Sequence, residues 1–194
     1  MKILGISALF HDSAVALIDE KNILSAVQEE RFSRIKHDPS FPNMSIEFCL
    51  KQNNLSPKDL DYVVFYDKPL LKFERLLETY LAFSPKGFRS FKAAIPIWLR
   101  EKLYLKDLII KELNNLDSNI NWNDKLKFSE HHLSHAASAF YPSPFKNSAI
   151  ITLDGVGEWS TTSTSIGDNY NINKIKEINF PHSLGLLYSA FTYF

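Results

Sequence analysis

The sequence lacks cysteine pairs, an excess of charge of either sign and long apolar runs, and each absence argues against a class of protein. Among its 194 residues Cys49 is the single cysteine, which excludes an internal disulfide and fits a reducing, cytoplasmic setting. Lysine plus arginine (22) balances aspartate plus glutamate (22), so neither nucleic acid nor an anionic membrane is expected as the main partner. No run reaches the roughly eighteen apolar residues that span a bilayer. His11 and Asp12 interrupt the apolar N-terminus too early for a secretory signal.

A histidine-rich segment followed by an acidic glycine turn is the main chemical feature of the chain. His131 and His135 stand four apart in an alanine-rich run with no proline before Pro142. We therefore predict a helix that carries both imidazoles on one face, the spacing that can hold a divalent metal. His132 lies about 100° around such a helix and cannot join the pair without distortion. The next segment, SAIITLDG, is a predicted strand closed by Asp154, whose carboxylate could complete a metal or phosphate site.

Predicted strands and helices alternate along the rest of the chain. Strands over 2–8, 13–19 and 23–29 form an antiparallel meander whose first turn carries His11 and Asp12. The further predicted elements are an ordered charged loop at 29–42, an amphipathic helix at 45–53, a buried parallel strand at 60–66, a helical region at 72–115 with breaks near Pro85, Gly87 and Pro96, and a short strand at 125–129 leading into the histidine helix.

Residues 148–180 repeat the pattern of residues 3–30: strand, acidic turn, strand, polar turn, strand. This repeat predicts a duplicated α/β domain whose halves face one another across a cleft, as in the actin-like ATPase (ribonuclease H-like) fold. In that fold the first hairpin of each half cradles the phosphates of a nucleotide. We expect a first actin-like subdomain at 1–147, with a helical insertion at about 70–120, and the start of a second at 148–194.

Several stretches together resemble the amino-terminal part of the NodU/CmcH-type O-carbamoyltransferases. They are GISALFHDSAVALIDEKNILSAVQEERFSRIKHDPSFP, EHHLSHAASAFYPSPF, ITLDGVGEWSTTS and SLGLLYSAFTYF. The resemblance implies an actin-like domain related to the enzymes of tRNA threonylcarbamoyl-adenosine synthesis, followed by a YrdC-like domain that this chain lacks. It also implies that carbamoyl phosphate and ATP give carbamoyl-adenylate, whose carbamoyl group passes to a hydroxyl of a sugar or natural product. A chain without the YrdC-like domain and a further metal-binding acid is not expected to catalyse the whole reaction.

The resemblance also implies roles for particular residues. His131, His135 and Asp154 would bind a divalent metal (iron, zinc, manganese or magnesium) at the phosphates of ATP, the co-substrate. His11 and Asp12 would lie near the site of carbamoyl transfer, where the imidazole is a reasonable general base toward the acceptor hydroxyl. The residues expected at the nucleotide are Ser13, Gly155, Val156 and Gly157.

Other interpretations stay open from the sequence. A sugar kinase or ATPase of the same fold would move phosphate and is not expected to carry HxxxH, and a non-catalytic module would bind nucleotide without turnover. Asp154 with Gly155 can be an ordinary turn, as can His11 with Asp12. The charged run that includes Glu29, Glu30, Arg31, Arg34 and Lys36 is either a solvated loop or, for its basic members, a contact with an anionic substrate. A homodimer is also left open.

Overall fold

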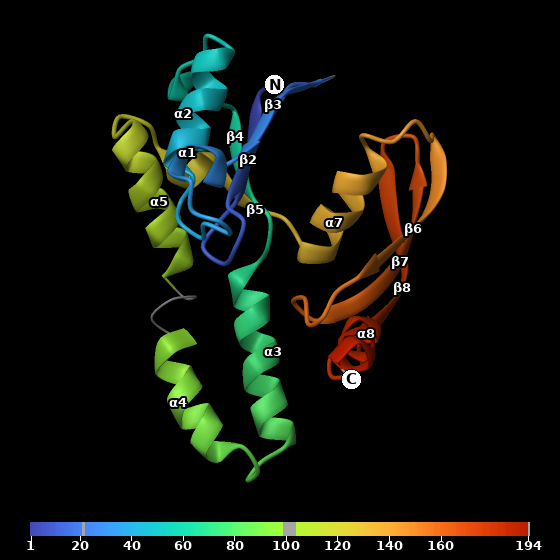
Figure 1. The fold of residues 1–194 in the computed structure, drawn as a ribbon. Helices are drawn as coiled ribbons and strands as arrows, with labels where there is room; N and C mark the ends of the chain where they lie inside the picture. The colour runs from blue at the N-terminus through green and yellow to red at the C-terminus, as the bar shows by residue number, and fades with distance from the viewer. Residues whose placement is uncertain (21, 99–103, 194) are drawn as a thin grey trace. The chain divides into compact units, whose positions relative to one another are not determined.

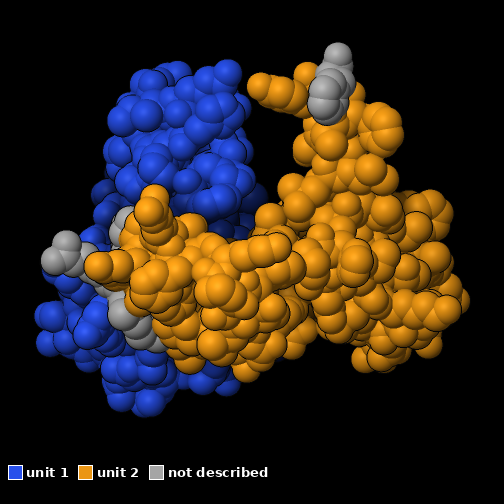
Figure 2. Space-filling model, turned by 90° about the horizontal axis from the view of Figure 1, so that it is seen from below, with its two compact units in different colours: residues 1–66, 104–128 blue, residues 67–103, 129–194 orange. Residues whose placement is uncertain are grey.

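The computed structural model describes residues 1–20, 22–98 and 104–193, which form two compact units (Figure 2). Unit 1 comprises Met1–Tyr66 and Tyr104–Phe128, and unit 2 comprises Asp67–Leu103 and Ser129–Phe194. The predicted boundary at residue 147 concerns the halves of a longer duplicated domain, and it stays a prediction. In the described part of the chain, no helix is both long and apolar enough to cross a membrane.

Unit 1 is built on a five-stranded mixed sheet in the order β3-β2-β1-β4-β5 (Figure 1). The strands are β1 (Ile3–Ser7), β2 (Ala14–Ile18), β3 (Ile23–Gln28), β4 (Tyr62–Phe65) and β5 (Leu126–Phe128). The first three pair antiparallel, which confirms the predicted meander. β4 pairs parallel to both β1 and β5, which confirms the predicted buried parallel strand.

Alternation along the strands places the core of unit 1 on one face of this sheet. The register sets Leu4 beside Leu17 and Val63, and it sets Ile6 beside Val15 and Phe65, so the buried side chains form continuous apolar rows. Two helices complete this core, α2 (Asn43–Gln52) and α5 (Leu105–Leu116). Their buried apolar members are Ile46, Cys49, Leu50, Leu105, Ile109 and Leu113. Cys49, rather than the partly exposed Phe48, therefore faces the core.

The segment predicted as a charged loop is non-helical over residues 34–42, but it begins with a single-turn helix, α1 (Glu30–Ser33), which the prediction missed. The residue that precedes α1 makes a long-range contact. Glu29 is buried, and its carboxylate accepts hydrogen bonds from the amide groups of Met44 (3.0 Å) and Ser45 (2.8 Å) and from the Ser45 hydroxyl (2.5 Å). These donors lie at the start of α2, whose first amide groups have no partner inside the helix. Glu29 therefore caps α2 and is not a solvated residue.

The helical region consists of α3 (Pro69–Ala82) and α4 (Phe88–Trp98) in unit 2 and α5 in unit 1, and a short helix, α6 (Trp122–Lys125), precedes β5. The interval between α3 and α4 confirms the predicted break near Pro85 and Gly87. The predicted break at Pro96 is wrong, because α4 continues through it.

Unit 2 contains a three-stranded antiparallel sheet against which the histidine helix packs (Figure 1). The strands are β6 (Asn147–Leu153), β7 (Ser160–Asp168) and β8 (Asn171–Asn179), and the helices are α7 (His131–Phe140) and α8 (Leu184–Tyr193). The contact between α7 and the sheet is close: a Cβ on Gly167 would lie 2.5 Å from the Phe140 ring. Both the histidine helix and the second meander are thus confirmed.

Candidate metal centre

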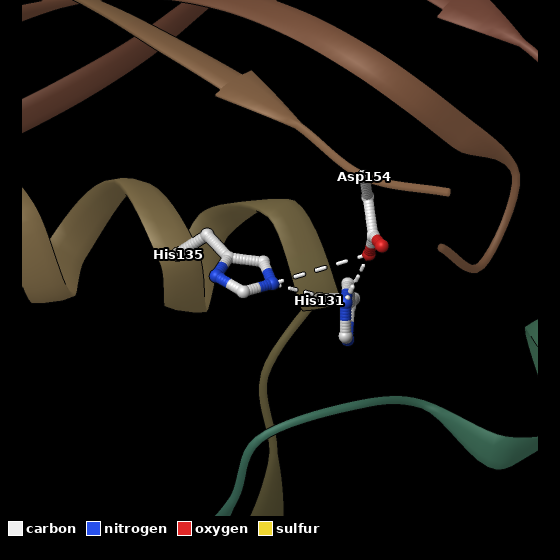
Figure 3. Close-up of side chains that lie close together, drawn as sticks. All are labelled: His131, His135 and Asp154. Carbon is white, nitrogen blue, oxygen red and sulfur yellow. Dashed lines mark hydrogen bonds and ion pairs between the residues drawn. The ribbon is translucent and has the colours of Figure 1, made fainter. Parts of the chain in front are cut away.

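Two imidazoles and a carboxylate converge in unit 2 (Figure 3). His131 begins α7, His135 follows one turn later, and Asp154 stands directly after β6. His131 Nε2 lies 2.6 Å from Asp154 Oδ2 and 3.1 Å from His135 Nε2, and the third distance, from His135 Nε2 to Asp154 Oδ2, is 3.9 Å. Across the described residues, this is the one group of three or more histidine, cysteine or acidic side chains with ligand atoms within 4.8 Å of one another.

The protonation states of Asp154 and His135 fit a divalent metal. The hydrogen bond from His131 holds the pKa of Asp154 down at about 2, so the carboxylate is ionised at neutral pH. Partial desolvation lowers the pKa of His135, whose side chain stays 53% exposed, and this favours the neutral imidazole. Ionised carboxylate and neutral imidazole are the forms that bind metal, and the N₂O donor set suits several divalent ions.

Glu158 fixes the start of α7, and sequence reasoning missed it. Its carboxylate is 6% exposed and accepts hydrogen bonds from the amide groups of His131 (3.2 Å) and Lys68. Burial raises the pKa of Glu158. Because Lys68 caps the start of α3, this one carboxylate joins three segments: the turn after β6, α7 and α3. The only local signal was an acid within GVGEW, which does not reveal distant partners.

The backbone around Asp154 is held by hydrogen bonds from both sides. The Asp154 amide donates to the Thr161 carbonyl at 2.8 Å, and Asp154 Oδ1 accepts the Gly155 amide at 2.7 Å. The Ser183 hydroxyl contacts the carbonyls of Asp154 (3.0 Å) and Gly155 (2.8 Å). Gly185 stands against the same backbone, because a Cβ there would lie 2.3 Å from the Asp154 carbonyl oxygen. The backbone that carries this carboxylate is therefore held independently of α7.

The glycine turn that follows is shaped by Arg75 of α3. The buried guanidinium donates from Nη1 to the carbonyls of Val156 (3.0 Å) and Gly157 (2.9 Å). Gly157 has φ +58°, and a Cβ there would lie 2.1 Å from the Ser160 carbonyl oxygen, so only glycine fits. The predicted role of Gly155, Val156 and Gly157 at a nucleotide stays a prediction.

His132 does not join the cluster, as its helical position predicted. Its side chain is buried, and Nδ1 lies 2.9 Å from the Ser163 hydroxyl on β7. Burial lowers its pKa to about 4, so the imidazole is neutral at physiological pH. His132 thus ties α7 to the sheet.

The predicted residues His11, Asp12 and Ser13 lie in unit 1, at the turn between β1 and β2. Asp12 Oδ2 accepts from His11 Nδ1 at 2.8 Å, and Asp12 Oδ1 accepts from His37 Nδ1 at 2.8 Å. Ser13 is buried, and its amide donates to the Asp38 carbonyl at 2.9 Å. Sequence reasoning missed His37, since nothing local distinguishes a histidine within a charged loop.

Fold and cluster together define an α/β protein with a candidate divalent-metal centre. The chain belongs to the carbamoyltransferase N-terminus family, whose model matches residues 2–194, and this confirms the resemblance drawn from the sequence. It is 58% identical over 193 residues to the uncharacterized protein sll1178 of Synechocystis, covering 99% of this chain and 31% of the relative.

Two further relatives are more distant. The nodulation protein NolNO of Sinorhizobium fredii is 31% identical over 186 residues (94% of this chain, 25% of the relative). The uncharacterized protein MJ1058 of Methanocaldococcus jannaschii is 28% identical over 248 residues (99% of this chain, 39% of the relative). The chain therefore spans less than half the length of each of these relatives.

Proposed function

We propose that the chain is the N-terminal part of an ATP- and metal-dependent O-carbamoyltransferase. In the proposed reaction, carbamoyl phosphate, ATP and one water give carbamoyl-adenylate, pyrophosphate and phosphate, and the carbamoyl group then passes to the hydroxyl of a sugar or natural product. Family membership supports carbamoyl transfer. The observation that carries metal dependence is the convergence of His131, His135 and Asp154 within 4.8 Å.

The repeated meander supports an actin-like, duplicated fold for the larger domain. β1, β2 and β3 form one antiparallel unit with an acidic turn after the first strand, and β6, β7 and β8 form another. The corresponding turns carry Asp12 and Asp154. In such a fold turns of this kind address nucleotide phosphates.

His131, His135 and Asp154 would hold the ion. A bound divalent ion would offset negative charge on the nucleotide phosphates. The residues around it supply rigidity: Glu158 fixes the backbone of His131, and Ser183 fixes that of Asp154. A ligand set fixed in this way loses little conformational entropy when metal binds.

His11 is the proposed general base of the transfer step. Its Nε2 would accept the proton of the acceptor hydroxyl while the acceptor oxygen bonds to the carbamoyl carbon. The bond from that carbon to the adenylate oxygen breaks, and AMP leaves with the electron pair. Water must be excluded from this step, because carbamoyl-adenylate would hydrolyse.

The buried thiol of Cys49, the single cysteine, supports a reducing, cytoplasmic setting.

The test uses the full-length protein and needs no acceptor. Metal content is measured by elemental analysis after incubation with iron(II), zinc, manganese or magnesium, and adenylate formation is measured as exchange of labelled pyrophosphate into ATP. We expect stoichiometric metal and exchange that requires carbamoyl phosphate, both lost in His131→Ala/His135→Ala and retained in His182→Ala. Formation of ADP in place of exchange would favour a kinase or ATPase. Nucleotide binding without either product would favour a non-catalytic module.

A further inference from the structure

A histidine that the proposed reaction does not yet use shares the carboxylate of Asp12 with His11. His37 comes from the loop after α1, 25 residues further along the chain, and its Nδ1 lies 2.8 Å from Asp12 Oδ1. The other carboxylate oxygen, Oδ2, is bonded to His11 Nδ1 at the same distance. One carboxylate thus joins two partly exposed imidazoles within unit 1.

The backbone holds this arrangement from both sides. The amide of Leu9 donates to the Pro39 carbonyl, and the amide of Ser13 donates to the Asp38 carbonyl, both at 2.9 Å, so the turn that carries Asp12 is hydrogen-bonded to the loop that carries His37. Asp12 has φ +48° and His37 has φ +58°. Residues other than glycine seldom adopt such angles, and they persist where surrounding contacts enforce them. Here the two strained residues bond to each other.

The charge of Asp12 fixes which nitrogens carry protons. An ionised carboxylate can only accept hydrogen bonds, so each Nδ1 must donate. In both neutral imidazoles Nε2 is then the basic nitrogen, the arrangement that a carboxylate imposes on the histidine of a catalytic triad. The pair therefore presents two basic Nε2 atoms supported by a single negative charge.

The acidic groups of the loop favour protonation of His37. The hydrogen bond and charge of Asp12 raise the pKa of His37, and the charge of Glu30 adds to this. Glu30 Oε2 also accepts the His37 amide at 3.2 Å, while Glu30 Oε1 faces Arg31 Nη2 at 3.8 Å. The neighbouring Asp38 is buried and bonded to Ser40, and Lys36 and Arg34 are the remaining charged residues of the loop.

We propose that His37 is a positioning residue for His11: it takes the first proton of the pair, offsets the charge of Asp12 and leaves His11 as the neutral base. A carboxylate bonded to His11 alone would favour the protonated imidazole, which cannot accept the hydroxyl proton. With His37 protonated, Asp12 still accepts the hydrogen bond that orients His11. Its negative charge is then partly offset, so it stabilises the protonated form of His11 less strongly. The catalytic part of this inference rests on the proposed function, whereas the linked protonation of the two histidines does not.

Histidine NMR tests the linkage directly. The ¹⁵N-histidine-labelled full-length protein is titrated as wild type and as His37→Asn, with His182→Asn as the matched control. Asparagine keeps a short side-chain N–H donor but cannot be protonated. We expect linked titrations in the wild type and, in His37→Asn, a single His11 titration displaced to higher pH. A His11 titration that is unchanged or displaced downward in His37→Asn would overturn the inference.

The pH dependence of the reaction tests the functional part. Transfer of the labelled carbamoyl group of carbamoyl phosphate to glycerol, the hydroxyl probe, is measured. Because His11 must be neutral to act, the acidic limb of kcat/KM should move to higher pH in His37→Asn by the same amount as the NMR titration, while the rate at high pH is retained within about twofold. If His37→Asn lowered the rate equally at every pH, His37 would have only a structural role, and its proposed effect on His11 would be refuted. A wild type without carbamoyl phosphate-dependent pyrophosphate exchange would overturn the proposed function, and the NMR titration would then decide the pairing on its own.

Discussion

Replacing Glu158 tests whether one buried carboxylate holds the candidate metal centre together. Glu158→Ala leaves the amide groups of His131 and Lys68 without their acceptor. An unpaired buried donor costs about 1–3 kcal/mol, so the two together cost about 2–6 kcal/mol. The raised pKa of Glu158 shows that burial disfavours its charge, and removing that charge offsets part of the loss. We expect a net loss of about 2–3 kcal/mol for alanine and about 1 kcal/mol for glutamine, which keeps one acceptor oxygen.

Urea unfolding and metal calorimetry measure the two consequences separately. Because the lost hydrogen bond fixes the first residue of α7, the affinity for the divalent ion should fall about tenfold in Glu158→Ala. Glu78→Gln removes a charge from the exposed face of α3 and should change neither quantity. A Glu158→Ala protein with wild-type unfolding free energy and metal affinity would refute the reasoning. A variant more stable than wild type would show that burying the carboxylate costs more than its two hydrogen bonds return.

Three further predictions follow from single contacts. Glu29→Ala removes the cap of α2 and should lower the free energy of unfolding by about 2 kcal/mol in urea titrations, whereas the exposed Glu47→Ala on the same helix should have little effect. Gly157→Ala should lower the free energy of unfolding by at least about 1 kcal/mol from its positive φ alone. Gly155→Ala should be tolerated, because its Cβ would meet only one side chain, at 3.8 Å. Equal thermal midpoints for the two variants would contradict this. Burial raises the pKa of Cys49, so a thiol reagent should label it only after unfolding, and rapid labelling of the native protein would show that the core opens.

The cluster was largely predictable because its residues obey local geometry. An i, i+4 histidine pair shares a face of any helix, so His131 and His135 had to lie together once α7 formed. A strand that ends at Asp154 had to bring a carboxylate to the edge of its sheet. The same local rules separated His132 from the pair. Predictions failed where a distant partner decided, as at Glu29, which caps a helix that begins more than ten residues later.

The sequence by itself determined the strands, the principal helices and the two meanders, because alternation and helical spacing are properties of consecutive residues. It also determined the family, because several motifs occur in one order along the chain. Only the tertiary structure decided which polar groups meet. Glu158 reaches the starts of α3 and α7, Arg75 shapes the glycine turn, and His37 joins His11 at Asp12. Such contacts depend on where the backbone brings segments that are far apart in sequence, and no local pattern contains that information.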